Sequence, residues 1–216
     1  MHDLERELVP VCPQLEVIVV DDASSDNSPA ILSELSATRP WLQVQRLEPN
    51  VGHGPAVRHG LDRARGEWIF QLDSDGQFRV DEFPLLWERR HHADLLLGVR
   101  LERHDPRHRL LLTRVVAAAV SALAARRVQD ANTPFRLMRR ETWEDVRPFV
   151  DPTALAPNIL IAVGAIVRGW RIVEVPVTHL PREGGTSTLR ALRLLRFSLS
   201  GLFQLLAYRR RVRARR

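Results

Sequence analysis

Short apolar runs alternate with longer amphipathic segments through most of the chain. The runs are rich in β-branched residues, a pattern typical of buried strands. They predict strands over Leu15–Val20, Val44–Leu47, Trp68–Leu72, Asp94–Val99 and Ile172–Val177. Apolar positions at helical spacing predict helices over Ser28–Thr38, Pro55–Arg65, Asp81–His91, His108–Arg127, Leu155–Arg168 and Leu189–Tyr208. Because strands and helices alternate, we expect an α/β fold with a mostly parallel central sheet flanked by helices, similar to a Rossmann fold.

The beginning of the chain departs from this alternation. Asp3–Val9 has the pattern of a helix remnant, and the strand Leu15–Val20 follows it with no earlier strand. An α/β nucleotide-binding fold is expected to begin with a strand. We therefore expect an N-terminally shortened sheet in which one edge of Leu15–Val20 is exposed.

Length and composition favour one globular domain. The chain has 216 residues, of which 44% are hydrophobic, enough to bury one core. We expect a catalytic domain over 1–188 and a separate basic segment over 189–216. Cys12 is the sole cysteine and no signal-peptide pattern is present, so we expect a cytoplasmic protein without disulfides. Arg114 and Ser121 interrupt the most apolar stretch, which predicts no membrane span.

The net charge of +6 is carried by arginine, since the sequence contains no lysine. The predicted helix Leu189–Tyr208 places arginines among leucines and phenylalanines, and a basic tail follows it. This combination is typical of a helix that lies on an anionic membrane, so we expect a peripheral protein at the inner face of the membrane. The alternative is an ordinary packing helix with a solvated arginine face. The tail arginines are Arg209, Arg210, Arg211, Arg213, Arg215 and Arg216.

The most specific local pattern is Asp73-Ser74-Asp75-Gly76-Gln77, directly after the predicted strand Trp68–Leu72. Ligands of open α/β sheets bind beyond the carboxyl ends of the strands. Carboxylates at Asp73 and Asp75 point the same way from extended backbone, and the carbonyl of Gln77 can join them. Such a set of oxygens suits Mg²⁺ or Mn²⁺, which would bind a diphosphate. The alternative is an acidic turn that only solvates the end of the strand.

A second acidic turn follows the predicted strand that ends at Val20. Asp26 and Ser28 suit the capping of the next helix, whereas Asp22 is the better candidate for ligand binding. Carboxylates at the ends of two strands favour a binding site over simple capping.

In this order the motifs resemble the inverting glycosyltransferases of family 2 with the GT-A fold, specifically the polyprenyl-phosphate branch of the dolichyl-phosphate mannose synthase type. The resemblance covers nearly the whole chain. It implies transfer of a sugar from a nucleotide diphosphate sugar to a lipid phosphate with inversion, dependent on Mg²⁺ or Mn²⁺. The residues that carry it are Val17–Ser28, Asn50–Gly54, Gly60, Ala64–Gly66, Asp73–Gln77, Gly98–Arg100, Asp130, Pro134–Arg136, Gly169–Val177 and Arg182–Ser187.

The resemblance assigns donor and metal contacts to four of these positions. It implies that Asp22 contacts the nucleoside of the donor and that Asp73 lies by its ribose or by the metal. It implies further that Asp75 and Gln77 are metal ligands, with Asp75 essential for catalysis.

The resemblance also assigns phosphate binding to Arg100, Arg114 and Arg182, with Ser187 beside the last, and guanidinium groups suit phosphate oxygens. A lipid phosphate is already ionised at neutral pH, so it needs positioning and charge neutralisation more than a strong base. Arg182 and the metal would stabilise the leaving diphosphate. Asp130 is a candidate for orienting the acceptor or the sugar; the alternative is that it caps the turn after Arg127.

The chain departs from the family pattern in several places. It lacks the first strand and the Asn-Glu turn that lines the nucleotide site. Thr188 replaces a common lysine, Ala118 replaces a common serine, and Asn158 stands where an acidic residue often precedes the apolar helix.

Other functions remain open from the residues alone. One alternative is a transferase for a soluble or polysaccharide acceptor, and another is a non-catalytic fragment that binds nucleotide sugars. The basic composition would suit nucleic acid, but no recognised binding motif or interleaved aromatic pattern is present, so we expect no such partner. The histidines lack the spacing of metal ligands, and His179 is expected to be a bystander near the site.

Overall fold

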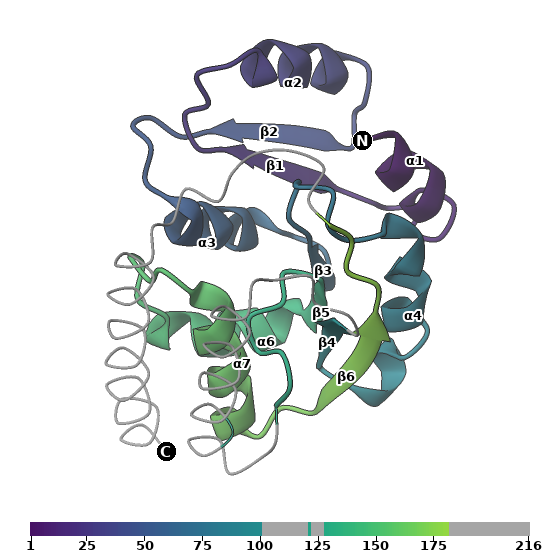
Figure 1. Cartoon of the computed structure of the whole chain (residues 1–216), viewed down its shortest axis with the longest axis vertical. Helices are drawn as coiled ribbons and strands as arrows, with labels where there is room; N and C mark the ends of the chain where they lie inside the picture. Colours follow the sequence, from purple (N-terminus) through teal and green to yellow (C-terminus); the bar gives the residue numbers. More distant parts are fainter. Residues whose placement is uncertain (101–120, 122–127, 182–216) are drawn as a thin grey trace.

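A computed structural model of the chain describes residues 1–100, 121 and 128–181 (Figure 1). Most of the predicted helix His108–Arg127, the whole of Leu189–Tyr208 and the basic tail lie outside these residues, as do Arg114, Arg182 and Ser187. The described elements are α1 (His2–Leu8), β1 (Val17–Asp21), α2 (Ser28–Ala37), β2 (Leu42–Arg46), α3 (His53–Arg63), β3 (Trp68–Gln71), η1 (Val80–Glu82), α4 (Phe83–Trp87), η2 (Arg90–His92), β4 (Leu95–Arg100), β5 (Arg136–Arg139), α6 (Arg140–Val146), η3 (Arg147–Phe149), α7 (Pro157–Arg168) and β6 (Ile172–Val177).

The first strands form a parallel pair. Val17 lies opposite Leu42 and Asp21 opposite Arg46, so β1 and β2 are in register over their whole length. Helix α2 packs on β2 and helix α3 packs on β1, on opposite sides of the pair (Figure 1). This arrangement is the predicted alternation of strands and helices.

The second sheet has the strand order β3-β5-β4-β6. Strands β4 and β6 are parallel, whereas β5 is antiparallel to both of its neighbours, β3 and β4. Three of its strands therefore run in one direction, which confirms the mostly parallel sheet. The sequence pattern missed β5, because this short strand has an arginine at each end and no apolar run.

No ladder joins the two sheets within the described part of the chain. Strand β1 pairs with β2 alone, and β3 pairs with β5 alone. The second edge of β1 is thus unpaired by any described strand.

The four-stranded sheet is buried on both faces, which explains the continuous apolar run of β4. Leu95 and Leu97 pack on one face against α6 and α7, whereas Leu96 packs on the other face with residues of α1 and α4. Figure 1 shows α7 on one side of this sheet and α4 on the other. All three leucines are fully buried.

The predicted helix Asp81–His91 is wrong in extent. The segment forms η1, the short helix α4 and η2 in succession. Only Phe83 and Leu86 reach the core, and the charged residues that follow Trp87 have no apolar face to continue a packed helix.

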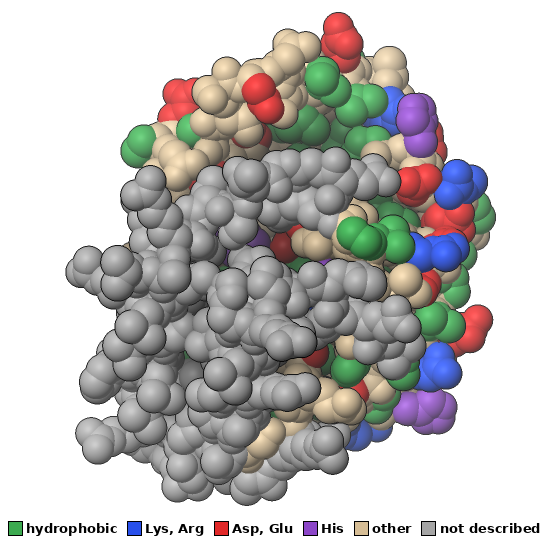
Figure 2. Space-filling view, viewed as in Figure 1, with side chains coloured by type: hydrophobic (Ala, Val, Ile, Leu, Met, Phe, Trp, Pro, Cys, Tyr) green, Lys and Arg blue, Asp and Glu red, His purple; other side chains and the backbone are tan. Residues whose placement is uncertain are grey.

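Charges of both signs are interspersed on the flank formed by α1 and α4 (Figure 2). Arg6 pairs with Asp3 and Glu7, and Arg79 pairs with Asp81. This flank therefore presents no patch of a single sign. Within the described ranges, no helix combines the length and hydropathy needed to span a bilayer.

Candidate active site

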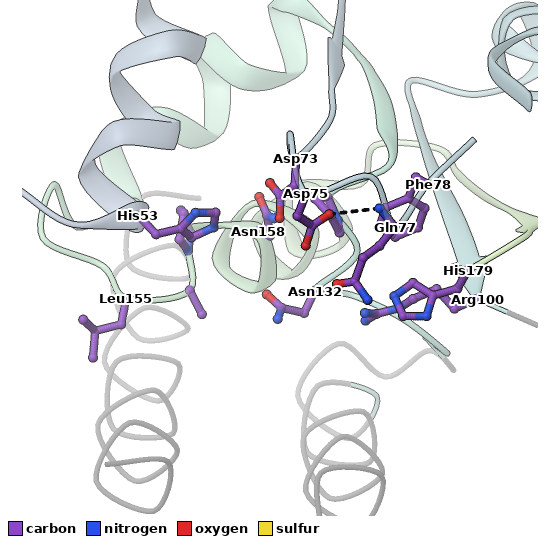
Figure 3. A pocket seen from close by; sticks show the side chains of 13 residues that line it. His53, Asp73, Asp75, Gln77, Phe78, Arg100, Asn132, Leu155, Asn158 and His179 are labelled. Atoms are coloured by element: carbon purple, nitrogen blue, oxygen red, sulfur yellow. Dashed lines mark hydrogen bonds between the residues drawn. The ribbon is translucent and has the colours of Figure 1, made fainter. Parts of the chain in front are cut away.

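A pocket of about 160 Å³ lies where the carboxyl ends of β3 and β4 meet the start of α7 (Figure 3). Segments distant in sequence converge there, which is the position expected for a ligand site in an α/β sheet. The lining residues are His53, Asp73, Asp75, Gln77, Phe78, Arg100, Asn132, Pro134, Leu155, Ala156, Pro157, Asn158 and His179.

Asp73 and Asp75 both face this pocket, as the sequence predicts. The carboxylate of Asp75 accepts the backbone N–H of Gln77 at 3.2 Å across the turn at Gly76, whose φ is +72°. Burial raises the pKa of the Asp73 carboxyl and the charge of Asp75 raises it further, against the opposing charges of His53, Arg136 and Arg100. Burial of the Asp73 carboxyl thus outweighs the positive charges that face it, and a second carboxylate, Asp75, lies near it.

These two side chains fit a divalent cation. Their oxygens are the ligands that Mg²⁺ and Mn²⁺ prefer, and no described residue donates a hydrogen bond to the Asp73 carboxylate. Across the described ranges, no cluster of three or more histidine, cysteine or acidic side chains forms a metal site. A cation at Asp73 and Asp75 would thus take its remaining ligands from other groups, such as the oxygens of a diphosphate.

Gln77 joins the acidic turn to the segment after β6. Its backbone carbonyl accepts the N–H of Leu180 at 2.8 Å, and its side-chain Nε2 donates to the carbonyl of Leu180 at 3.3 Å. Gln77 also lines the pocket. Its role as a metal ligand stays a prediction.

Arg100 and Asp130 form one unit at this site. The guanidinium donates to both carboxylate oxygens, at 2.6 and 2.9 Å, and both side chains are largely buried. The turn that carries Asp130 is held by Glu174, whose carboxylate accepts the N–H of Gln129 at 2.7 Å. Both carboxylate oxygens of Asp130 therefore bind Arg100 and do not cap the turn. Arg100 lines the pocket, and the carboxylate of Asp130 partly compensates its positive charge.

Asp22 does not line the pocket. Its carboxylate oxygens accept the backbone N–H groups of Val51 and Gly52, each at 2.8 Å. It thereby fixes the loop before α3, which begins at His53, two residues earlier than predicted. The role of Asp22 as a nucleoside contact stays a prediction.

The neighbouring acidic residues serve the turn itself. Asp21 accepts the N–H of Ser24 at 2.9 Å and pairs with Arg46, and these hydrogen bonds lower the pKa of its carboxyl. Asp26 accepts the N–H of Ser28 at 2.9 Å and so stabilises the turn before α2, whose N-cap is Asn27 and not Asp26 or Ser28.

Gly54 allows α3 to approach the loop before α7. A Cβ atom at this position would lie 1.8 Å from the carbonyl oxygen of Ala154, so no larger residue fits without moving backbone. The glycine of the Asn50–Gly54 motif is therefore explained by close packing, and the packing brings His53 to the pocket.

Arg136 lies beneath the site and was assigned no role from the sequence. It is completely buried, and its guanidinium donates to the carbonyls of Ala131, Thr133 and Asn158. Burial lowers the pKa of this guanidinium to about 9. The sequence contains 32 arginines, and nothing in it shows which of them is buried. Only the position of Arg136 in the Pro134–Arg136 motif distinguished it from the others.

The sequence analysis assigned no binding role to three further polar residues of the pocket, Asn132, Asn158 and His179. His179 lies at the site, as expected: its side chain is buried, lines the pocket and packs edge-on against Phe78, with 5.4 Å between the ring centroids, and its role as a bystander stays a prediction. Arg114, Arg182 and Ser187 lie outside the described residues, so their predicted contacts are not placed.

The fold, with the acidic turn at the end of β3, is that of the GT-A class of glycosyltransferases. The chain belongs to glycosyl transferase family 2, whose family model matches residues 6–147. It is similar to a polyprenol monophosphomannose synthase of Mycolicibacterium smegmatis, with 30% identity over 204 residues, 86% of this chain and 77% of that protein. It is also similar to an undecaprenyl-phosphate 4-deoxy-4-formamido-L-arabinose transferase of Edwardsiella ictaluri, with 28% identity over 90% of this chain and 60% of that protein.

Solved structures agree with the fold. Glucosyl-3-phosphoglycerate synthase from Mycobacterium tuberculosis, in complex with Mn²⁺, uridine diphosphate and phosphoglyceric acid, matches with a TM-score of 0.64 at 18% identity, over 96% of this chain and 75% of that chain. TarS from S. aureus in complex with UDP matches with a TM-score of 0.59 at 20% identity, over 96% of this chain and 62% of that chain. At sequence identities this low, the matches show a shared fold alone.

Proposed function

We propose that this chain transfers a sugar from a nucleotide diphosphate sugar to a polyprenyl phosphate, with inversion at the anomeric carbon. The observation that carries the proposal is the pair Asp73 and Asp75 in one pocket with Arg100, at the carboxyl ends of β3 and β4. The names of the curated relatives, a polyprenol monophosphomannose synthase and an undecaprenyl-phosphate transferase, support a lipid phosphate as the acceptor.

Asp73 and Asp75 would hold a Mg²⁺ or Mn²⁺ ion, and Gln77 stands beside them as the third predicted ligand. When bound, the ion supplies positive charge to the diphosphate. The Mn²⁺ and uridine diphosphate in the solved structure of a fold relative support this assignment. Asp22 contributes by fixing the loop that leads into α3, and so by placing His53 at the pocket.

The acceptor phosphate needs positioning more than deprotonation, because it is ionised at neutral pH. One of its oxygens attacks the anomeric carbon on the face opposite the diphosphate. The new carbon–oxygen bond forms as the bond to the diphosphate breaks, and the nucleoside diphosphate leaves with the electron pair. Arg100, held by Asp130, would bind phosphate oxygens at the pocket, and Arg114, Arg182 and Ser187 would complete phosphate binding.

The acceptor also defines the proposed location. A polyprenyl phosphate resides in a membrane, so the enzyme would work as a peripheral protein at the cytoplasmic face. The basic segment 189–216 would bind anionic lipid there.

Turnover of purified protein tests the proposal. We expect transfer of radiolabelled sugar from a nucleotide sugar to undecaprenyl phosphate in detergent, and loss of this transfer in excess EDTA. Transfer to a water-soluble acceptor alone would overturn the lipid assignment, and full transfer in EDTA would overturn the role of the metal.

A further inference from the structure

Asn158 occupies an unusual position at the start of α7. The residue is only 3% exposed, yet its side chain lines the pocket. Its backbone carbonyl accepts a hydrogen bond from Arg136 at 3.0 Å, which fixes the first turn of the helix. Asn158 is therefore a buried side chain, rigidly held, at the wall of the candidate active site.

The side-chain oxygen of Asn158 is not satisfied by the described part of the protein. Its Oδ1 atom is buried and accepts a hydrogen bond from no described residue. Buried amide groups are nearly always hydrogen-bonded, and those that are not are explained by a bound group or a functional role. Because Asn158 lines a pocket, a ligand is the natural donor.

The surrounding groups restrict the class of that ligand. Asn158 lines the same pocket as Asp73 (Figure 3). An ionised phosphate offers no proton to the Oδ1 atom of Asn158. A hydroxyl group can donate a hydrogen bond to this oxygen, which favours the sugar over the phosphates of a nucleotide sugar.

The start of α7 adds to this preference for a neutral, hydroxyl-bearing group. Pro157 has no N–H, and the N–H of Ile159 donates to the carbonyl of Ala156 at 3.2 Å, so the first turn presents few free donors to an anion. An amide cannot take up a proton at neutral pH, so Asn158 is suited to recognition and not to acid–base chemistry.

We propose that Asn158 hydrogen-bonds a hydroxyl of the transferred sugar and determines which sugars the enzyme accepts. This inference rests on the proposed function, because it takes the pocket to be the donor site. Asn158 would thus be a specificity-determining residue that touches the sugar while the carboxylates of Asp73 and Asp75 serve the diphosphate.

The substitution Asn158→Leu tests this role, because leucine has the same branching and the same number of heavy atoms as asparagine and no polar atoms. Its binding should be measured by calorimetry in Mn²⁺ with UDP-glucose and GDP-mannose, and with UDP and GDP as the sugar-free partners. We expect the affinity for the nucleotide sugar that the wild type binds to fall roughly tenfold and the affinity for the sugar-free nucleotide to stay the same. The matched control is Asn27→Ala, an exposed asparagine at the N-cap of α2 with no side-chain capping bond.

Stability and deoxy sugars separate recognition from a structural role. Removing an unsatisfied buried amide should leave the melting temperature of Asn158→Leu unchanged or higher, whereas a structural asparagine would lower it. Monodeoxy analogues of the bound sugar should include one that wild type and variant bind equally well. Equal weakening for nucleotide and nucleotide sugar, as expected of a metal ligand, would overturn the inference, and so would unchanged binding of both. A wild type that binds neither nucleotide sugar would instead refute the proposed function.

Discussion

The guanidinium of Arg100 donates to both carboxylate oxygens of Asp130, 30 residues further along the chain, at 2.6 and 2.9 Å. The sequence suggested separate roles for the two residues, one for phosphate and one for the acceptor or sugar. Their pairing means that Asp130 acts through Arg100, by holding its side chain at the pocket. Loss of Asp130 should therefore lower both the stability of the fold and the transfer activity.

We therefore predict that Asp130→Ala lowers the free energy of unfolding by about 3 kcal/mol, because it leaves the largely buried charge of Arg100 without a partner. Urea unfolding measures this loss. The double variant Arg100→Met with Asp130→Leu should recover most of the stability but none of the transfer activity. Equal stability of the single and double variants would contradict the pairing argument.

The acidic turn gives a second prediction. Asp75→Ala should abolish transfer and Mn²⁺ binding while changing the melting temperature little, since a partly exposed carboxylate at a strand end contributes little to the core. Asp81→Ala is the matched control, because this carboxylate is exposed, pairs with Arg79 and does not line the pocket. Full activity of Asp75→Ala would remove the residue from the metal site.

Two glycines of α3 give a third prediction. Gly54→Ala should destabilise the protein by about 2–3 kcal/mol and impair the pocket, because the added methyl would lie 1.8 Å from the carbonyl oxygen of Ala154. Gly60→Ala, in the same helix, would meet only Cγ2 of Val20 at 3.2 Å and gains helix propensity, so its stability should stay within about 1 kcal/mol of wild type. Thermal unfolding of the two variants measures the difference. Similar losses of stability in both variants would count against the close-packing argument.

The pairing of Asp94 with Arg171 predicts that the stability of the protein depends on pH. Arg171 donates to its carboxylate through Nε at 3.1 Å and Nη2 at 3.0 Å, and this pairing lowers the pKa of the Asp94 carboxyl. A lowered folded-state pKa stabilises the protein above the unfolded pKa of about 4, and this contribution is lost as the pH falls through the folded value. Because the side chain of Arg171 is 59% exposed, we expect Asp94→Asn to cost only about 1 kcal/mol at pH 7.

Denaturant unfolding at neutral and acidic pH checks this expectation. The difference between wild type and Asp94→Asn should shrink as the pH falls below 4 and vanish below the folded pKa. Glu34→Gln, on the exposed surface of α2, serves as the control for removal of a carboxylate. A difference that stays constant with pH would show that Asp94 acts through its shape and not through its charge.

The basic tail gives a prediction that rests on the sequence. Deleting residues 209–216 should weaken sedimentation with anionic vesicles, and the remaining difference should shrink at high salt because the attraction is electrostatic. Neutral vesicles are the control. Equal sedimentation of the full and shortened chains with anionic vesicles would contradict the membrane role.

The sequence predicted the strands well because burial imposes a strong pattern on them. Strand β4 is buried on both faces and reads as a continuous apolar run, and the carboxylates of Asp73 and Asp75 mark the end of β3. Strand β5 was not predicted, because it has an arginine at each end although it lies between two neighbours inside the sheet. Arg136 can be buried there because its guanidinium donates hydrogen bonds to backbone carbonyls.

The amino-acid sequence by itself determined the α/β class, the place of the acidic turn and the family, because periodicity and contiguous motifs are local properties of the chain. The tertiary structure decided which of these residues meet. It turned Asp22 toward the loop before α3, joined Arg100 to Asp130, and brought Asn158 and His179 to one pocket. Such contacts depend on the strand order and on the burial of each side chain, and neither is encoded in the spacing of residues along the chain.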